Sequence, residues 1–301
     1  MKALMFSGQG AQKIGMGKDF YDNFDICRKT FDEASEALGL DMAALCFEEN
    51  DMLNQTAYAQ PALLTIGISA YRLLKEKGFI PDILMGLSLG EYTALTASEA
   101  INFTDAVCLV RRRGQIMTEF AKPGGMVASV GLSKEVLEQI CINAQNEDLG
   151  FAACANFNTH DQIVLAGEKT ALDFCLTEIK KAGGKAIPLK VSGPFHTKLL
   201  NEAAEKFREE LLKINVLTPK FPIISNLTAD IFKVEDYAAH LMQHMISPVR
   251  WAESVEKAVS MGVDRFIELG SGKTLAGFVK KINNTVDCFA IESVSDLEGI
   301  L

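Results

Sequence analysis

Short apolar runs and amphipathic stretches alternate along most of the chain. Continuous apolar runs predict buried strands, and apolar residues repeating every three or four positions predict helices. Before residue 123 the pattern predicts strands at 2–6 and 83–85 and helices at 19–39, 57–77 and 102–120. After residue 191 it predicts strands at 221–224, 264–268 and 287–291 and helices at 197–213, 235–246, 250–260 and 274–282. This alternation is typical of an α/β protein with a mostly parallel sheet covered on both faces.

The pattern changes at Pro123-Gly124-Gly125. The next residues predict strands at 126–130, 151–156, 162–166 and 185–190 and helices at 133–144 and 168–182. The order βαββαβ is typical of a ferredoxin-like fold. We therefore predict a small ferredoxin-like subdomain at 124–190, inserted into a large subdomain made of residues 1–123 and 191–301.

Composition narrows the class of protein. The chain is 48% hydrophobic and 23% charged, as in ordinary globular proteins, and no apolar run approaches the roughly 18 to 20 residues of a membrane span. The net charge of −9 argues against nucleic-acid binding. The apolar part of the N-terminus is too short for a signal peptide. Seven cysteines without a C-x-x-C pair favour a reducing, cytoplasmic location.

The clearest candidate for chemistry lies at residues 82–95. An apolar run at 83–85 leads into Gly86-Leu87-Ser88-Leu89-Gly90, and a helical pattern follows from Glu91. This is the strand, tight turn and helix of the nucleophile elbow in α/β-hydrolases. It would hold the Ser88 hydroxyl at a helix N-terminus, where a developing negative charge is stabilised. We therefore predict an α/β-hydrolase-like large subdomain.

A serine nucleophile needs a base, and the chain has four histidines. His160 lies in a predicted turn, which favours an exposed residue. His240 and His244 share a helix face at a spacing that suits a metal, but no third ligand is evident, so a plain helix surface is preferred. His196 follows Ser192-Gly193-Pro194-Phe195 on an irregular stretch. The position of His196 is compatible with two roles, that of a general base and that of a structural histidine.

Other motifs give weaker signals. Three consecutive helical arginines, 111–113, cannot share a face, so at least one can point inward and pair with a substrate carboxylate. Gly8 and Gly10 do not complete a dinucleotide-binding motif. The run 270–274 is not a P-loop, because residue 267 is isoleucine instead of the glycine that the motif needs.

Six separate motifs follow one another along the chain. They are Phe6-Ser7-Gly8-Gln9-Gly10-Ala11-Gln12, Gly86-Leu87-Ser88-Leu89-Gly90-Glu91, Arg113-Gly114 with Met117, Gly193-Pro194-Phe195-His196, Ser247-Pro248-Val249-Arg250-Trp251 and Glu268-Leu269-Gly270-Ser271-Gly272-Lys273. In this order they closely resemble the motifs of malonyl-CoA:acyl carrier protein transacylases and of the acyltransferase domains of polyketide and fatty acid synthases. The resemblance covers nearly the whole chain.

The resemblance implies roles for named residues. Ser88 would be the nucleophile, with His196 as its general base and acid. The backbone N–H groups of Gln9 and Leu89 would form an oxyanion hole, and Arg113 would bind the malonyl carboxylate. The backbone carbonyl of His244, four residues before Pro248, would orient His196. No metal and no cofactor are implied, because the coenzyme A thioester is a substrate.

The implied reaction is malonyl transfer from coenzyme A to the phosphopantetheine thiol of an acyl carrier protein, by a ping-pong mechanism through a malonyl-serine, for fatty acid biosynthesis. The implied partners are malonyl-CoA and acyl carrier protein, and the protein would be a monomer. Two alternatives remain: a free-standing loader of a polyketide synthase, and a serine esterase or thioesterase.

Two positions depart from the family pattern. Leu87 stands where the family usually has histidine, and His244 stands where it usually has glutamine. A cluster of basic residues late in the small subdomain is a candidate docking surface for an acidic carrier protein, although an ordinary solvated surface has the same pattern. Its members are Lys180, Lys181, Lys185 and Lys190.

Overall fold

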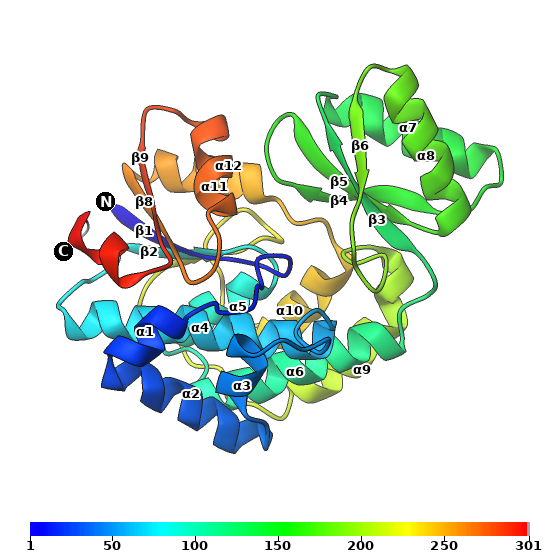
Figure 1. The fold of residues 1–301 in the computed structure, drawn as a ribbon. Helices are drawn as coiled ribbons and strands as arrows, with labels where there is room; N and C mark the ends of the chain where they lie inside the picture. The colour runs from blue at the N-terminus through cyan, green and yellow to red at the C-terminus, as the bar shows by residue number, and fades with distance from the viewer. Residues whose placement is uncertain (300–301) are drawn as a thin grey trace.

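A computed structural model describes residues 1–299 and contains two separate sheets (Figure 1). The larger sheet has five parallel strands in the order β7-β2-β1-β8-β9. Its strands are β1 (Lys2–Phe6), β2 (Ile83–Gly86), β7 (Ile223–Ile224), β8 (Arg265–Leu269) and β9 (Asp287–Ile291). The predicted mixed α/β architecture with a parallel sheet is confirmed. No helix within the described range is both long enough and apolar enough to span a bilayer.

Successive residues of each strand point to opposite faces of this sheet, and helices cover both faces. Leu4 and Phe6 enter the larger core, whereas Ala3 and Met5 enter a second core. The second core is closed by α11 (Trp251–Ser260) and α12 (Thr274–Ile282). The opposite side carries α1 (Lys18–Asn23), α2 (Asp25–Leu38), α3 (Met42–Phe47), α4 (Thr56–Glu76), α5 (Leu89–Ala97), α6 (Phe103–Glu119), α9 (Asn201–Leu211) and α10 (Tyr237–Ile246) (Figure 1).

The smaller sheet is antiparallel, with strand order β4-β5-β3-β6. Its elements are β3 (Gly125–Val130), α7 (Lys134–Asn146), β4 (Ala152–Phe157), β5 (Gln162–Gly167), α8 (Lys169–Lys181) and β6 (Lys185–Pro188), in the predicted order βαββαβ. Val127 and Leu165 pack against α7 and α8. Met126 and Val164 belong instead to the core of the larger sheet and line a cavity that both sheets border.

The structure corrects several predicted elements. The helix predicted at 19–39 is two helices, because Phe24 adopts an extended backbone between them. The helix predicted at 197–213 begins as a 3₁₀ turn, Lys198–Leu200, before α9. The short helix α3 and a final 3₁₀ segment, Val294–Gly299, were missed because neither is long enough to show a period.

Candidate active site

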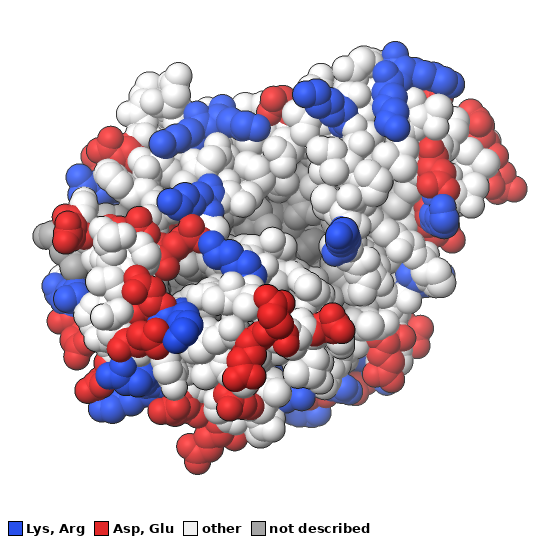
Figure 2. All heavy atoms as spheres, viewed as in Figure 1, with Lys and Arg blue, Asp and Glu red and all other residues white. Residues whose placement is uncertain are grey.

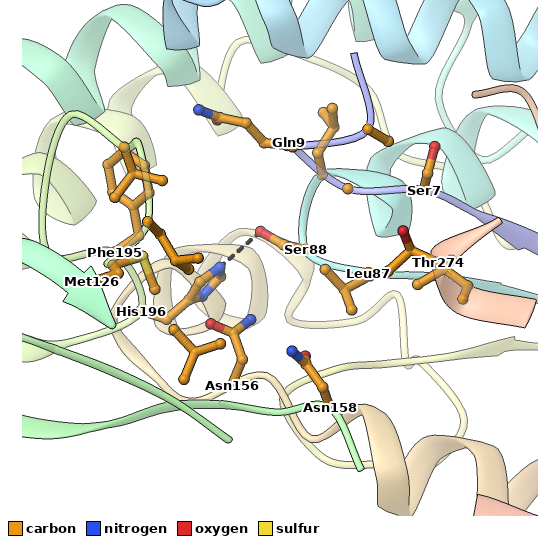
Figure 3. Close-up of a pocket in the computed structure, with 18 of the residues that line it drawn as sticks. Ser7, Gln9, Leu87, Ser88, Met126, Asn156, Asn158, Phe195, His196 and Thr274 are labelled. Carbon is orange, nitrogen blue, oxygen red and sulfur yellow. Dashed lines mark hydrogen bonds between the residues drawn. The ribbon is translucent and has the colours of Figure 1, made fainter. Parts of the chain in front are cut away.

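Ser88 occupies a strained turn between β2 and α5. Its φ of 53° and ψ of −100° are rare for a residue with a side chain. The flanking glycines make this turn possible: a Cβ at Gly86 would lie 1.9 Å from the carbonyl carbon of Gly90, and one at Gly90 would lie 2.1 Å from the Phe6 oxygen. The turn aims the Ser88 hydroxyl into the cavity (Figure 3).

His196 lies beside this hydroxyl. The Ser88 Oγ is 2.7 Å from His196 Nε2, and His196 Nδ1 donates to the His244 carbonyl oxygen over 3.1 Å (Figure 3). This pattern leaves Nε2 free to accept the serine proton. Burial, and then the positive charge of Arg113, lower the pKa of His196 to about 4. The imidazole is therefore neutral near pH 7, as a general base requires.

Arg113 lies behind Ser88 and is only 1% exposed. Its Nη1 donates to Gln60 Oε1 over 3.0 Å, and its Nη2 is 3.5 Å from Ser88 Oγ. The guanidinium also lies over the Tyr92 ring, 5.1 Å from the centroid. Within residues 1–299 no carboxylate forms an ion pair with it, and burial lowers its pKa. A buried cation in this state can accept an anionic ligand.

Close helix packing brings Arg113 inward. A Cβ on Gly114 would lie 2.6 Å from the Thr56 oxygen, so α6 can approach α4 this closely only with glycine there. Arg111 and Arg112 on the same helix remain partly or fully exposed. The expectation that at least one of the three arginines points inward is therefore confirmed.

Gln9 and Leu89, the two candidates for an oxyanion hole, both line the cavity beside Ser88. Gln9 lies in the loop after β1, and Leu89 is the first residue of α5. The described part of the chain offers neither N–H a hydrogen-bond acceptor, whereas the neighbouring Ser88 N–H donates to Asn226 Oδ1. The Gln9 side chain is held by Thr56 Oγ1, 3.1 Å from its Nε2. Unpaired N–H donors at a helix start can stabilise a developing oxyanion.

The cavity has a volume of about 250 Å³ and is lined from both sheets. The larger sheet contributes Ser88 and Leu87, while Asn156 and Asn158 approach from the smaller sheet (Figure 3). The Oδ1 atom of Asn158 is buried and has no hydrogen-bond partner among the described residues. Leu87 gives the wall formed by the larger sheet an apolar surface.

The remaining histidines lie outside this cavity. The His160 side chain is 66% exposed in the turn after β4, as expected, and contacts Glu256. His240 Nε2 lies 2.6 Å from Ser225 Oγ, so its i, i+4 spacing with His244 does not make a metal site. Among residues 1–299 no group of three potential metal ligands comes together. The expectation of a plain helix surface was wrong for His244, because its ring is fully buried.

A family model described as "Acyl transferase domain" matches residues 4–289. The chain belongs to the acyl transferase family. It is 41% identical to the malonyl CoA-acyl carrier protein transacylase of Bacillus subtilis strain 168, with 98% of this chain and 95% of that protein covered. The resemblance inferred from the six motifs is confirmed.

Solved structures similar to this acyltransferase agree with its fold. The malonyl CoA-acyl carrier protein transacylase of Clostridium perfringens superposes with a TM-score of 0.95 at 41% identity, covering 99% of this chain and 95% of that one. A Streptococcus pneumoniae MCAT gives 0.95 at 45% identity, covering 100% and 99%. A third structure, a malonyl-transacylase in complex with a type II PKS acyl-carrier protein, gives 0.96 at 36% identity, covering 100% and 98%.

Four polar residues of the acyltransferase site were missed from the sequence. Gln60 lies inside an apolar helix, and Asn156 and Asn158 lie at the end of a small-sheet strand. Asn226 is fully buried behind the elbow. The sequence Ser225-Asn226-Leu227-Thr228 has only the pattern of a turn. A polar residue inside an otherwise apolar helix was the one usable signal, and it applied to Gln60 alone.

Proposed function

We propose that this acyltransferase moves a malonyl group from coenzyme A to the phosphopantetheine thiol of an acyl carrier protein. The reaction proceeds by a ping-pong mechanism through a malonyl ester of Ser88. The proposal rests on one observation above the others: a serine paired with a neutral histidine lies within 3.5 Å of a buried arginine. The names of the relatives supply the thioester and the carrier protein as substrates.

The first half-reaction begins at the Ser88 hydroxyl. His196 Nε2 removes its proton as the oxygen attacks the malonyl carbonyl carbon, and the His244 carbonyl stabilises the imidazolium through Nδ1–H. The N–H groups of Gln9 and Leu89 donate to the oxyanion, each contributing about 3 kcal/mol of barrier lowering. The tetrahedral intermediate then expels the coenzyme A thiolate, which takes the proton from His196.

The second half-reaction reverses these steps with another thiol. His196 deprotonates the phosphopantetheine thiol of the carrier protein, and the sulfur attacks the malonyl ester. Collapse returns the proton to Ser88 Oγ. One base and one oxyanion hole therefore serve both half-reactions, because the two thioesters are chemically equivalent.

Arg113 supplies the selectivity for a dicarboxylic acyl group. Its Nη2 points toward Ser88, and Gln60 holds its Nη1, so one side of the guanidinium faces the acyl group. A malonyl carboxylate would pair with this buried charge, whereas acetyl would leave it without a partner. We therefore expect acetyl-CoA to be a poor substrate.

Intact-protein mass spectrometry tests the proposal directly. The wild-type protein mixed with malonyl-CoA should gain one malonyl group, and Ser88→Ala should gain none. Acetyl-CoA should give little adduct under the same conditions. Absence of the wild-type adduct would contradict the proposal. Equal labelling by malonyl and acetyl groups would favour a general serine esterase or thioesterase.

A second candidate is loading of a polyketide synthase. It is favoured by the solved relative that is bound to a type II PKS acyl-carrier protein, at 36% identity. The chemistry is the same, and only the carrier protein differs. Comparing kcat/KM for a fatty acid carrier with that for a polyketide carrier distinguishes the two, with a preference for the fatty acid carrier expected.

We also propose a docking surface for the carrier protein beside the cavity mouth. Lys180, Lys181, Lys185 and Lys190 are exposed near the end of the smaller sheet. Figure 2 shows basic side chains on the smaller subdomain, most of them at its end away from the hollow between the two sheets and one at the edge of that hollow. An acidic carrier protein would be attracted there in spite of the net charge of −9. Reversing these four charges should raise the KM for carrier protein and leave the KM for malonyl-CoA unchanged.

We also propose a fold type for each of the two subdomains. The elbow after β2 supports an α/β-hydrolase-like large subdomain at 1–123 and 191–301. The strand order β4-β5-β3-β6 supports a ferredoxin-like small subdomain at 124–190. We further propose a cytoplasmic monomer that needs no cofactor, and size-exclusion chromatography with light scattering tests the monomeric state.

A further inference from the structure

We infer that Asn226 is a positioning residue for the nucleophile, holding the strained turn at Ser88 from behind. This inference rests on the proposed role of Ser88. Asn226 lies just beyond β7, far from Ser88 in the sequence, and is 0% exposed. It does not line the cavity, so it acts on the substrate only through the elbow.

The Asn226 amide contacts the start of the turn and its strained residue. Its Oδ1 accepts the Ser88 N–H over 2.6 Å, and its Nδ2 donates to the Gly86 carbonyl oxygen over 2.8 Å. A single planar group thus fixes the separation between Gly86 and the strained Ser88. The turn needs such support, because backbone in a rare region persists only where its surroundings over-determine it.

Asn226 is in turn anchored by Glu91, which lies in the first turn of α5. The Asn226 N–H donates to Glu91 Oε2 over 2.7 Å, and the Asn226 carbonyl accepts from the Arg250 N–H over 3.0 Å. Glu91 is fully buried and also lies 4.0 Å from His244 Nδ1. The elbow and the segment whose carbonyl holds His196 therefore meet at the same buried carboxylate.

The arrangement affects two catalytic distances together. If the turn relaxes, the Ser88 Oγ moves relative to His196 Nε2, and the adjacent Leu89 N–H moves relative to the oxyanion. A misplacement of about 1 Å lowers rates by about 100-fold. Loss of the amide should therefore lower kcat strongly while the KM for malonyl-CoA changes little, because Asn226 touches no part of the cavity.

Asn226→Leu removes both hydrogen bonds at similar volume. Ser225→Ala is the matched control, because it deletes two neighbouring hydrogen bonds, one between Ser225 Oγ and His240 and one from the Leu227 N–H to Ser225 Oγ, and neither involves the elbow. The readouts are kcat and KM with malonyl-CoA, and the rate at which phenylmethylsulfonyl fluoride sulfonylates Ser88 with release of fluoride. We expect Asn226→Leu to lower kcat and labelling by about 100-fold, and Ser225→Ala to lower neither by more than about 3-fold.

Asn226→Asp provides an internal control for folding. Its protonated carboxyl group can replace both hydrogen bonds, whereas its ionised form faces the Gly86 oxygen with a negative charge. The titratable groups around this position are Glu91 from α5, His240 and His244 from α10, and His196 and Arg113 beyond Ser88. Because burial raises the pKa of a carboxyl group, we expect labelling relative to wild type to be about 10-fold higher at pH 5.5 than at pH 8.5.

The outcomes separate this inference from the proposed function. Wild-type labelling of Ser88 by the sulfonyl fluoride, without any malonyl adduct, would contradict malonyl transfer and leave the elbow measurements valid. Folded Asn226→Leu with wild-type labelling would overturn the positioning role. If Asn226→Leu does not fold, the pH comparison decides, and an Asn226→Asp profile parallel to wild type would overturn the inference.

Discussion

The two walls of the cavity differ in what they contribute. The large-sheet wall holds the strained Ser88, the free N–H groups of Gln9 and Leu89, and the buried Arg113 behind them. The small-sheet wall, formed by Met126, Asn156, Asn158 and Val164, offers apolar surface and two neutral amides. Reactive groups thus lie at the carboxyl ends of parallel strands, whereas the antiparallel sheet supplies shape.

This contrast has a physical cause. The ends of parallel strands bring loops and helix N-termini together, so backbone N–H groups point at one place. An antiparallel sheet satisfies its own backbone groups internally and presents only side chains. We therefore expect changes on the large-sheet wall to alter the chemical step by orders of magnitude, and changes on the small-sheet wall to alter binding by small factors.

The largest effect is expected for His196→Ala, which removes the base that acts on the large-sheet wall. Acylation of Ser88 by malonyl-CoA should slow by about 10⁴-fold or more, as for the base of other serine enzymes. Rapid-quench measurement of the acyl-enzyme tests this. His160→Ala, in the exposed turn of the smaller sheet, is the control and should behave as wild type. A small loss in His196→Ala would remove this residue from the mechanism.

Arg113→Ala should give the next largest effect. Loss of a buried charge partner typically costs about 2–5 kcal/mol, so kcat/KM for malonyl-CoA should fall by about 30-fold or more. The value for acetyl-CoA should hold or rise, because the site no longer contains a buried cation. The control is Arg112→Ala, at the exposed neighbouring position, which should leave kcat/KM for malonyl-CoA and for acetyl-CoA unchanged. Equal losses for the two substrates would argue against carboxylate recognition.

The pH dependence of the acylation rate should show a smaller effect, which also concerns the large-sheet wall. Burial and Arg113 lower the pKa of His196 to about 4, so the neutral base persists above that pH and is lost below it. The acylation rate should stay nearly flat from pH 8 to pH 5. For a histidine with an ordinary pKa near 6.5, the neutral fraction, and with it the acylation rate, would already have fallen about 30-fold at pH 5. A midpoint near 6.5 in single-turnover measurements would contradict this electrostatic environment.

Asn158→Ala should have the smallest effect, because it changes only the small-sheet wall. Its side chain lines the cavity, and its buried Oδ1 has no partner within residues 1–299, so we expect it to accept one hydrogen bond from the thioester substrate. We expect a rise of about 5- to 10-fold in the KM for malonyl-CoA, in line with about 1 kcal/mol per hydrogen bond, and an unchanged kcat. A fall of kcat by orders of magnitude would break the contrast between the walls.

The sequence was informative where short motifs impose a backbone shape. The spacing of Gly86, Ser88 and Gly90 predicts the elbow, because only small residues permit that turn. The order of strands and helices was also predictable, since apolar periods survive in each element. Asn226 was not predictable, because its two partners belong to a segment that meets it only in the folded chain. The break at Phe24 carries neither proline nor glycine, so no local signal marked it.

Arg113 links the folding of the protein to its metabolite. A buried guanidinium whose described neighbours form no ion pair with it lowers the stability of the ligand-free protein. A molecule that binds only the native state raises the free energy of unfolding in proportion to the logarithm of its concentration. If malonyl binds at Arg113 as proposed, it should therefore act as a stabiliser as well as a substrate. Resistance to heat and to proteases should rise with the supply of the compound that the enzyme consumes.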